Sequence, residues 1–175
     1  MMCGIIQGNV ATKDTLSNRR IMNVVKSYTT NHSRIVDPFA RDCELAAPYT
    51  NDINPNTKAK FHMDALNFLE MLEEDNDIFD VGLMDPPFSQ RQEKELYGTN
   101  LYTQPRKIKQ IELAMGNIIR PGGYVIKFGY NSNFSHKAFE LVHVVLVQYQ
   151  ASINDTIISI HEKTNHDIRS YDDEQ

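Results

Sequence analysis

Cysteine is scarce in this sequence, and its two cysteines are not arranged for metal binding or cross-linking. Cys3 and Cys43 lie far apart in the chain and form no CxxC pair. Two isolated cysteines provide neither a zinc-binding pattern nor a disulfide framework. We therefore expect a protein without a metal centre that works in a reducing compartment.

Long apolar runs and a leader segment are also absent. No stretch approaches the roughly 18 consecutive apolar residues of a membrane-spanning helix, so we expect no membrane span. The first residues, MMCGIIQGNVATKD, lack a basic start and carry only a very short apolar patch. They match a signal peptide poorly, and we expect a cytoplasmic protein.

An excess of positive charge is missing as well. The formal net charge of −5 argues against a protein that coats nucleic acid through a general positive field. This balance is compatible with a local basic patch. Basic residues cluster after position 90, at Arg91, Lys94, Arg106, Lys107 and Lys109.

The length and composition predict one compact domain. A chain of 175 residues with 41% hydrophobic and 23% charged residues is ordinary for a soluble globular protein. We find no internal repeat and no low-complexity linker. Residues 1–165 are expected to form the domain, and residues 166–175 an acidic tail.

Hydrophobic periodicity predicts helices and strands that alternate along the chain. Helices are expected over residues 18–29, 65–72 and 107–119, capped by Ser17 and Asp64 at the first two, with a short helix between 130 and 143. Strands are expected over 34–39, 80–85, 124–130, 143–149 and 156–163, and a weaker one over 47–54. This order predicts an α/β fold, a mostly parallel sheet with helices on both faces. The last two strands predict an antiparallel hairpin at the far edge.

Acidic residues mark the ends of three expected strands. Asp37 follows the first strand, Asp52 the weaker second one and Asp85 the third, while Asp64 begins a helix. Aspartate favours turns and caps, so each alone is unremarkable. In a parallel sheet, however, these carboxylates would lie near one rim, where ligands of such sheets bind.

The third of these ends has an unusual composition. In the stretch VGLMDPPFSQ, residues 81–90, an apolar run meets an acid, two prolines and an aromatic ring. Two prolines cannot continue a strand ladder, so the segment could simply be a strand-to-loop turn. The other acids in matching order favour a functional interpretation.

Together these motifs resemble class I S-adenosylmethionine (SAM) dependent amino-methyltransferases, whose fold is Rossmann-like. The order of TNDINP, HMDALNFL, MDPPF, RPGGYVIKFGYNSN and NDTIISI is similar to small adenine-specific DNA methyltransferase-like proteins of phages and prophages. The resemblance covers roughly residues 34–163. It implies SAM as cofactor, and the host cytoplasm as location if a phage encodes the chain.

The resemblance implies a role for each motif. It implies that the cofactor is bound by Asp37, Pro38, Phe39, Asp52 and Asp64, and that catalysis rests on Asp85, Pro86, Pro87 and Phe88. The chain departs from the family in one place. Its first motif, DPFARDCELA, contains none of the glycines that let backbone approach the cofactor.

The chemistry of amine methylation explains why such a motif is useful. The exocyclic amine of a base is a poor nucleophile because its lone pair is delocalised into the ring. Acceptors on its N–H groups, the Asp85 carboxylate and the Pro86 carbonyl, would favour a pyramidal nitrogen. Phe88 would stack on the base, which contributes about 1–3 kcal/mol.

Substrate contacts outside this motif are less sharply indicated. Arg91 follows it directly, and Asn131 and Asn133 lie in a loop after a central strand, where the alternative is an ordinary polar loop. No separate target-recognition region is evident. We therefore predict low sequence specificity, or recognition supplied by a second copy or a partner protein.

Nucleic acid is the expected partner, with adenine N6 in DNA as the first hypothesis. One alternative is an RNA methyltransferase acting on a guanine or adenine amine, because such enzymes carry a similar motif. Another is a SAM-binding protein without transferase activity that interferes with host modification. The missing glycines and the missing recognition region are both compatible with it.

Overall fold

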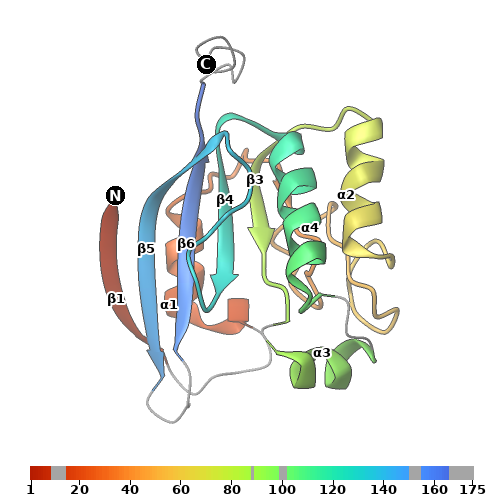
Figure 1. Cartoon of the computed structure of the whole chain (residues 1–175), viewed down its shortest axis with the longest axis horizontal. Helices are drawn as coiled ribbons and strands as arrows, with labels where there is room; N and C mark the ends of the chain where they lie inside the picture. The colour runs from red at the N-terminus through yellow and green to blue at the C-terminus, as the bar shows by residue number, and fades with distance from the viewer. Residues whose placement is uncertain (9–14, 88, 99–101, 150–154, 166–175) are drawn as a thin grey trace.

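The computed structural model of the chain describes residues 1–8, 15–87, 89–98, 102–149 and 155–165. In this part of the chain, six strands form one mixed sheet in the order β1-β5-β6-β4-β3-β2 (Figure 1). They are β1 (Met2–Gly8), β2 (Ile35–Val36), β3 (Phe79–Met84), β4 (Ile119–Gly129), β5 (Phe139–Tyr149) and β6 (Thr156–Lys163). Only β6 runs antiparallel to its neighbours among these strands. The predicted α/β class with a mostly parallel sheet is confirmed.

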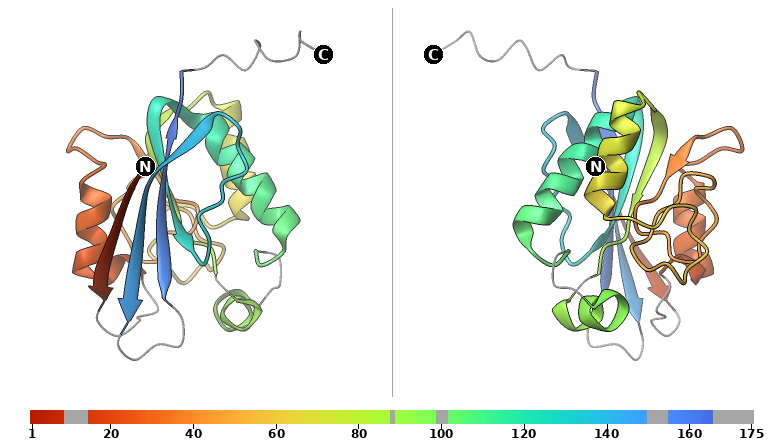
Figure 2. Two further views of the ribbon diagram at one scale, coloured as in Figure 1. Left: turned by 60° about the vertical axis from the view of Figure 1, so that its left-hand side comes forward. Right: turned by 90° about the vertical axis from the view of Figure 1, so that its right-hand side faces the viewer.

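Helices cover both faces of the sheet. The helices are α1 (Arg19–Lys26), α2 (Ala65–Glu74), α3 (Gln90–Tyr97) and α4 (Pro105–Ile118), with a 3-10 turn η1 (Thr15–Ser17) before α1. Figure 2 shows α1 on one side of the sheet and α2 with α4 on the other. No helix in the described part of the chain is long and apolar enough to cross a membrane.

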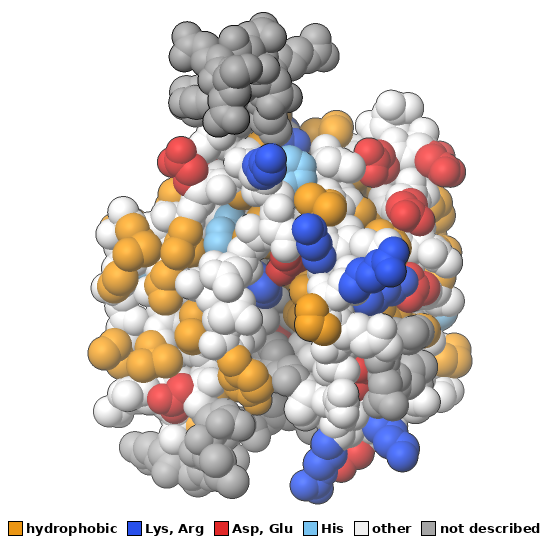
Figure 3. All heavy atoms as spheres, viewed as in Figure 1, with side chains coloured by type: hydrophobic (Ala, Val, Ile, Leu, Met, Phe, Trp, Pro, Cys, Tyr) orange, Lys and Arg blue, Asp and Glu red, His pale blue; other side chains and the backbone are white. Residues whose placement is uncertain are grey.

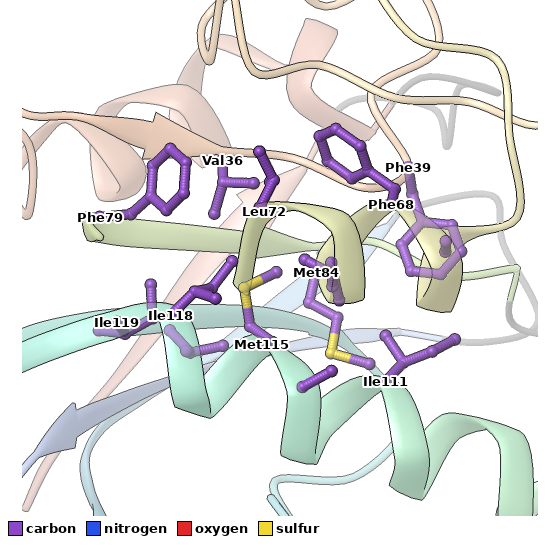
Figure 4. Close-up of a cluster of buried hydrophobic side chains, with 14 of the residues drawn as sticks. Val36, Phe39, Phe68, Leu72, Phe79, Met84, Ile111, Met115, Ile118 and Ile119 are labelled. Carbon is purple, nitrogen blue, oxygen red and sulfur yellow. The ribbon is translucent and has the colours of Figure 1, made fainter. Parts of the chain in front are cut away.

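The larger core lies between the sheet and the pair α2 and α4. Phe68 and Leu69 of α2 and Met115 of α4 are completely buried there, against Met84 of β3 (Figure 4). In each helix the buried positions recur at spacings of three and four residues, which places these side chains on the inner faces of their helices. This packing fixes β3, which leads directly into Asp85, and α4, which carries part of the candidate site.

A second core joins α1 to the opposite face of the sheet. Ile21 and Val25 of α1 are completely buried against Phe128 of β4 and Ile158 of β6. The helix begins at Arg19 and is capped by Asn18, whose Oδ1 accepts the backbone N–H of Arg20 at 2.9 Å. The prediction that Ser17 caps this helix was therefore wrong, and the helix ends at Lys26 rather than near residue 29.

The C-terminal strands are arranged differently from the prediction. The β5–β6 pair is antiparallel, as expected, but β6 lies between β5 and β4 rather than at the edge. The edge is formed by β1, which pairs in parallel with β5 and was not predicted. A short segment with two glycines has little strand propensity of its own, so its pairing depends on a partner remote in sequence.

Three further segments also differ from the prediction. The weak strand over 47–54 is reduced to isolated bridges, Asp37 with Thr50 and Asn51 with Phe61. No helix forms between β4 and β5, where residues 131–138 are irregular. The segment after the prolines, where no helix was predicted, contains α3. This helix lies beyond the carboxyl ends of β3 and β4 (Figure 1).

Candidate active site

The DPP segment begins directly where β3 ends. β3 stops at Met84, Asp85 is half-buried, and Pro86 and Pro87 are buried. Because proline has no N–H to donate, the ladder with β4 cannot continue through these residues. The chain therefore turns away from the sheet at its carboxyl rim. Phe88, the fourth residue of the motif, lies outside the described residues.

A first cavity of about 200 Å³ lies on one side of this segment. It is lined by Asp85, by residues 39–43 of the loop after β2 and by residues 15–17 of η1. The rim thus brings together the DPP segment and the first motif, as the predicted parallel sheet required. The lining contribution of η1 was not predicted, since no motif marks residues 15–17.

The loop after β2 makes its turn without glycine. The Asp37 carboxylate accepts the Phe39 N–H at 2.9 Å, and the Ala40 N–H donates to the Asn51 carbonyl at 2.9 Å. The chain then passes through Arg41 at a φ of 50°. A left-handed conformation costs a residue with a Cβ about 1–2 kcal/mol. The hydrogen bonds of the loop hold Arg41 in this conformation beside the cavity.

Two buried acids lie near this cavity. Asp37 and Asp52 are each 1% exposed. Burial raises the pKa of Asp37 to about 8, against the lowering effect of the Phe39 N–H and with further repulsion from Asp85 and Asp52. Asp37 is therefore largely protonated at neutral pH. The three strand-end acids predicted to lie near one rim do interact electrostatically.

Asp64 has a different environment from these three acids. It caps α2, accepts the Tyr102 hydroxyl at 3.0 Å and pairs with Lys107 at 2.8 Å. Burial alone would raise its pKa, but these hydrogen bonds outweigh burial and lower it. The predicted cap is confirmed. Asp64 lines neither of the two cavities described here, so its predicted contact with the cofactor stays a prediction.

A second cavity of about 380 Å³ lies on the other side of the DPP segment. Pro86 and Pro87 form part of its wall, and Asn131 and Asn133 line it as well. Arg91 does not line it. Its side chain is 88% exposed on α3 and pairs with Glu95 one helical turn later. Asp85 thus faces one cavity and the two prolines face the other.

Side chains outside the predicted set of site residues complete the second cavity. They include Tyr102 and Thr103 from the segment before α4, Glu112 from α4 and Lys127 from β4. Glu112 and Lys127 each place a charge within the apolar face of an expected helix or strand. This pattern could have marked them as candidate site residues. No such signal marks Tyr102, whose position depends on the tertiary structure.

Two contacts fix Tyr102 and Thr103 between the cavities. Glu93 of α3 is completely buried and accepts both backbone N–H groups, at 2.7 and 2.9 Å. The Tyr102 ring packs edge-on against Phe39, with ring centres 5.3 Å apart. Since Phe39 lines the first cavity and Tyr102 the second, this edge-to-face contact connects the walls of the two cavities.

The described residues contain no cluster of three or more His, Cys, Asp or Glu side chains suited to a metal ion. The site consists of carboxylates, prolyl backbone, amides and aromatic rings. Such groups can bind a polar organic ligand, orient an amine and stabilise a positive charge.

No protein-family model matches this sequence, and no curated protein matches it either. Solved structures do resemble the fold. N-methyltransferase NodS from Bradyrhizobium japonicum WM9 aligns with a TM-score of 0.58 at 13% identity, over 83% of this chain and 96% of its own. A Streptococcus mutans protein assigned as a SAM-dependent methyltransferase aligns with a TM-score of 0.58 at 10% identity. The alignment covers 86% of this chain and 50% of that protein. TrmN from Thermus thermophilus aligns with a TM-score of 0.54 at 13% identity. The alignment covers 81% of this chain and 47% of TrmN.

The chain therefore spans nearly all of one of these proteins and about half the length of the other two. At these identities the likeness concerns the fold. The chain has the Rossmann-like fold of class I methyltransferases, with a mixed and mostly parallel sheet.

Proposed function

We propose that this chain is a SAM-dependent methyltransferase that modifies the exocyclic amine of a nucleobase, adenine N6 in DNA. One observation carries the proposal: the DPP segment separates two cavities, with Asp85 on the first and Pro86 and Pro87 on the second. A methyl transfer requires a donor and an acceptor that meet in line at contact distance, and the DPP segment, which lines both cavities, is where a ligand in one would meet a ligand in the other. The methyltransferase fold supports the same interpretation.

The first cavity suits one part of SAM. Arg41 offers a cation for the carboxylate of its methionine part, and Asp42 offers an anion for its ammonium group. A volume of about 200 Å³ is below the roughly 300–1,000 Å³ of pockets that enclose a drug-sized ligand. The residues therefore fit the methionine part, while contacts of Asp52 to the nucleoside part belong to the proposal.

Bound SAM would supply an electrophilic methyl group on sulfur. The chain's own residues would prepare the amine that attacks it. The Asp85 carboxylate and the Pro86 carbonyl would each accept an N–H of the amine, and proline's fixed φ holds its carbonyl direction. After transfer, Asp85 would stabilise the cationic nitrogen and accept its proton, in a site largely screened from water. Holding the amine and the methyl group in line can supply roughly 7–11 kcal/mol.

Basic side chains near the second cavity support a nucleic acid as the polymer that carries the base. Lys109 lines the cavity, and Arg106 of α4 and Lys94 of α3 are exposed. None of the three takes part in an ion pair within the described residues. Figure 3 shows Lys and Arg side chains over α4 and, below it, over α3. Such a basic surface suits a phosphate backbone.

Recognition of a particular sequence would need further contacts. In the described part of the chain, no separate unit follows the candidate site that could read bases in a groove. A second copy of the chain or a partner protein would supply such contacts, or the enzyme would have low sequence specificity.

The proposal is tested by transfer of a labelled methyl group from SAM to duplex DNA, single-stranded DNA and RNA. Asp85→Ala should reduce transfer by about 10²–10³-fold, the usual loss for a preorganised charge-stabilising group. Asp80→Asn is the matched control. Asp80 lies in β3, the strand that Asp85 follows, but it pairs with Arg120 and lines neither cavity.

Equal transfer by wild type and Asp85→Ala would refute the role of Asp85. Label in RNA alone would move the substrate class from DNA to RNA. Binding of SAM without transfer to any of the three polymers would refute the enzymatic proposal and favour a SAM-binding protein.

A further inference from the structure

A buried ion pair lies beneath the second cavity. The Lys127 ammonium group on β4 is 2.7 Å from the Glu112 carboxylate on α4, and the two side chains are 8% and 4% exposed. Both residues line the cavity. The pair therefore places two charges, largely withdrawn from water, in the wall of a pocket that prolines, aromatic rings and several polar side chains also line.

The remaining hydrogen bonds of this pair go to one loop. Lys127 Nζ donates to the Asn133 carbonyl at 2.7 Å. The other Glu112 oxygen accepts from both the backbone N–H and the hydroxyl of Ser135, at 2.9 and 2.5 Å. Residues 131–135 form no regular structure. The pair is thus the connection that holds this loop to both β4 and α4.

Stability does not explain the pair well. Taking two charges out of water costs several kcal/mol per ion, and well-packed apolar residues in their place are often neutral or stabilising. His161, which lies behind the pair on β6, does not compete as a cation. Burial, together with the Lys127 charge, lowers its pKa to about 4 despite the opposing effect of Glu112.

We propose that Lys127 and Glu112 are positioning residues for the acceptor base: they hold loop 131–135 so that Asn131 and Asn133 form a fixed polar wall of the second cavity. The inference rests on the proposed function, because it treats this cavity as the acceptor site. An Asn amide offers a donor and an acceptor, the pair of groups that the edge of adenine requires. Without the ion pair, the loop would keep its sequence but lose its position.

The loop's internal geometry is consistent with this role. Asn131 Oδ1 accepts the Asn133 N–H at 3.1 Å, so the two asparagines are already linked to each other. The hydrogen bonds to β4 and α4 run through the carbonyl of Asn133 and through Ser135 to the buried pair, while the Phe134 ring between them packs against Phe139 and His161. Loss of the pair should therefore displace both asparagines together.

The test uses the full chain and two probes. S-adenosylhomocysteine reports on the first cavity through its binding by calorimetry. A single-stranded oligonucleotide containing 2-aminopurine reports on the second, because its fluorescence rises when the base leaves the stack, while its anisotropy reports attachment of the backbone. Methyl transfer kinetics on adenine DNA complete the set.

Lys127→Met should abolish the rise in 2-aminopurine fluorescence and raise KM for DNA about tenfold or more. It should leave the anisotropy titration and the affinity for S-adenosylhomocysteine within about twofold of wild type. Lys163→Met is the matched control. Lys163 is half-buried and, like Lys127, donates to backbone carbonyls, those of Gly116 and Ile119, but it does not line the second cavity.

A second variant keeps the test decisive if Lys127→Met leaves Glu112 unpaired and does not fold. The double variant Lys127→Met/Glu112→Leu replaces both charges by apolar groups, a change that buried pairs often tolerate. It should fold and show the same loss. Ser135→Ala, which removes one bond to Glu112, should show a smaller loss in the same direction.

The outcomes separate this inference from the proposed function. If wild type binds both probes and the folded variants give the same fluorescence rise and KM as wild type, the positioning role is wrong while the proposed function stands. If wild type fails to bind S-adenosylhomocysteine, or binds no oligonucleotide, the proposed function is wrong and the inference falls with it.

Discussion

The buried carboxyl of Asp37 makes the stability of the fold depend on pH, and replacing it by asparagine should remove that dependence. Asp37 is 1% exposed, and burial raises its pKa from 3.8 to about 8. Asparagine has the same shape and keeps an oxygen for the Phe39 N–H, which Asp37 accepts at 2.9 Å. The substitution therefore removes the ionisation and leaves the loop geometry intact.

The sign follows from proton binding. Between the unfolded pKa of 3.8 and the folded pKa of about 8, the folded protein holds one proton more than the unfolded chain. The contribution of Asp37 to stability is thus fully present below the unfolded pKa and is lost as pH rises toward the folded one. The slope is about 1.4 kcal/mol per pH unit, so from about pH 5.5 to about pH 7.5 wild type should lose about 3 kcal/mol relative to Asp37→Asn.

Urea unfolding of both proteins at a series of pH values measures this difference directly. The free energies of unfolding should be similar near pH 4 and should diverge progressively up to about pH 8, with the variant more stable. Curves that run parallel from pH 5.5 to 7.5 would show that Asp37 ionises normally in the folded protein. The account of a protonated acid behind the first cavity would then be wrong.

Two further substitutions probe the frame of the site by urea unfolding at neutral pH. Asp64→Ala should lower the free energy of unfolding by about 2 kcal/mol. The substitution removes a helix cap worth about 1 kcal/mol and leaves the partly buried Lys107 without its partner. A loss below about 0.5 kcal/mol would contradict the structural role assigned to Asp64. Arg41→Gly should raise the free energy of unfolding by up to about 1 kcal/mol, since glycine adopts a φ of 50° without strain. Destabilisation by this glycine would mean that the Arg41 side chain contributes more than its backbone costs.

The elements with strong local patterns could be predicted from the sequence. The α2 cap at Asp64 and the bounds of β6 agree with the prediction, and α4 agrees to within two residues. In each case the periodicity, the cap or the turn signal lies within the segment itself. By contrast, β1 depends on pairing with β5 almost the whole chain away, and α3 has few apolar residues to mark one face.

The candidate site divides in the same way. The acids after the strands could be predicted to share a rim, because the parallel order of a sheet brings its carboxyl ends together. The separation of the site into two cavities could not, since it depends on where η1, α3 and the loop after β4 pack. Glu112 and Lys127 carried a local signal as charges on apolar faces, yet nothing in the sequence shows that they meet each other.

The sequence by itself determined the layered α/β architecture and the placement of an acid and two prolines at the end of a central strand. Both follow from short-range rules: hydrophobic period, capping and the missing N–H of proline. Only the tertiary structure decided that Asp37 is buried deeply enough to stay protonated, that Asp64 is held by Lys107, and that a buried ion pair holds the loop of the second cavity. Burial and charge pairing depend on residues remote in sequence, and folding alone brings those together.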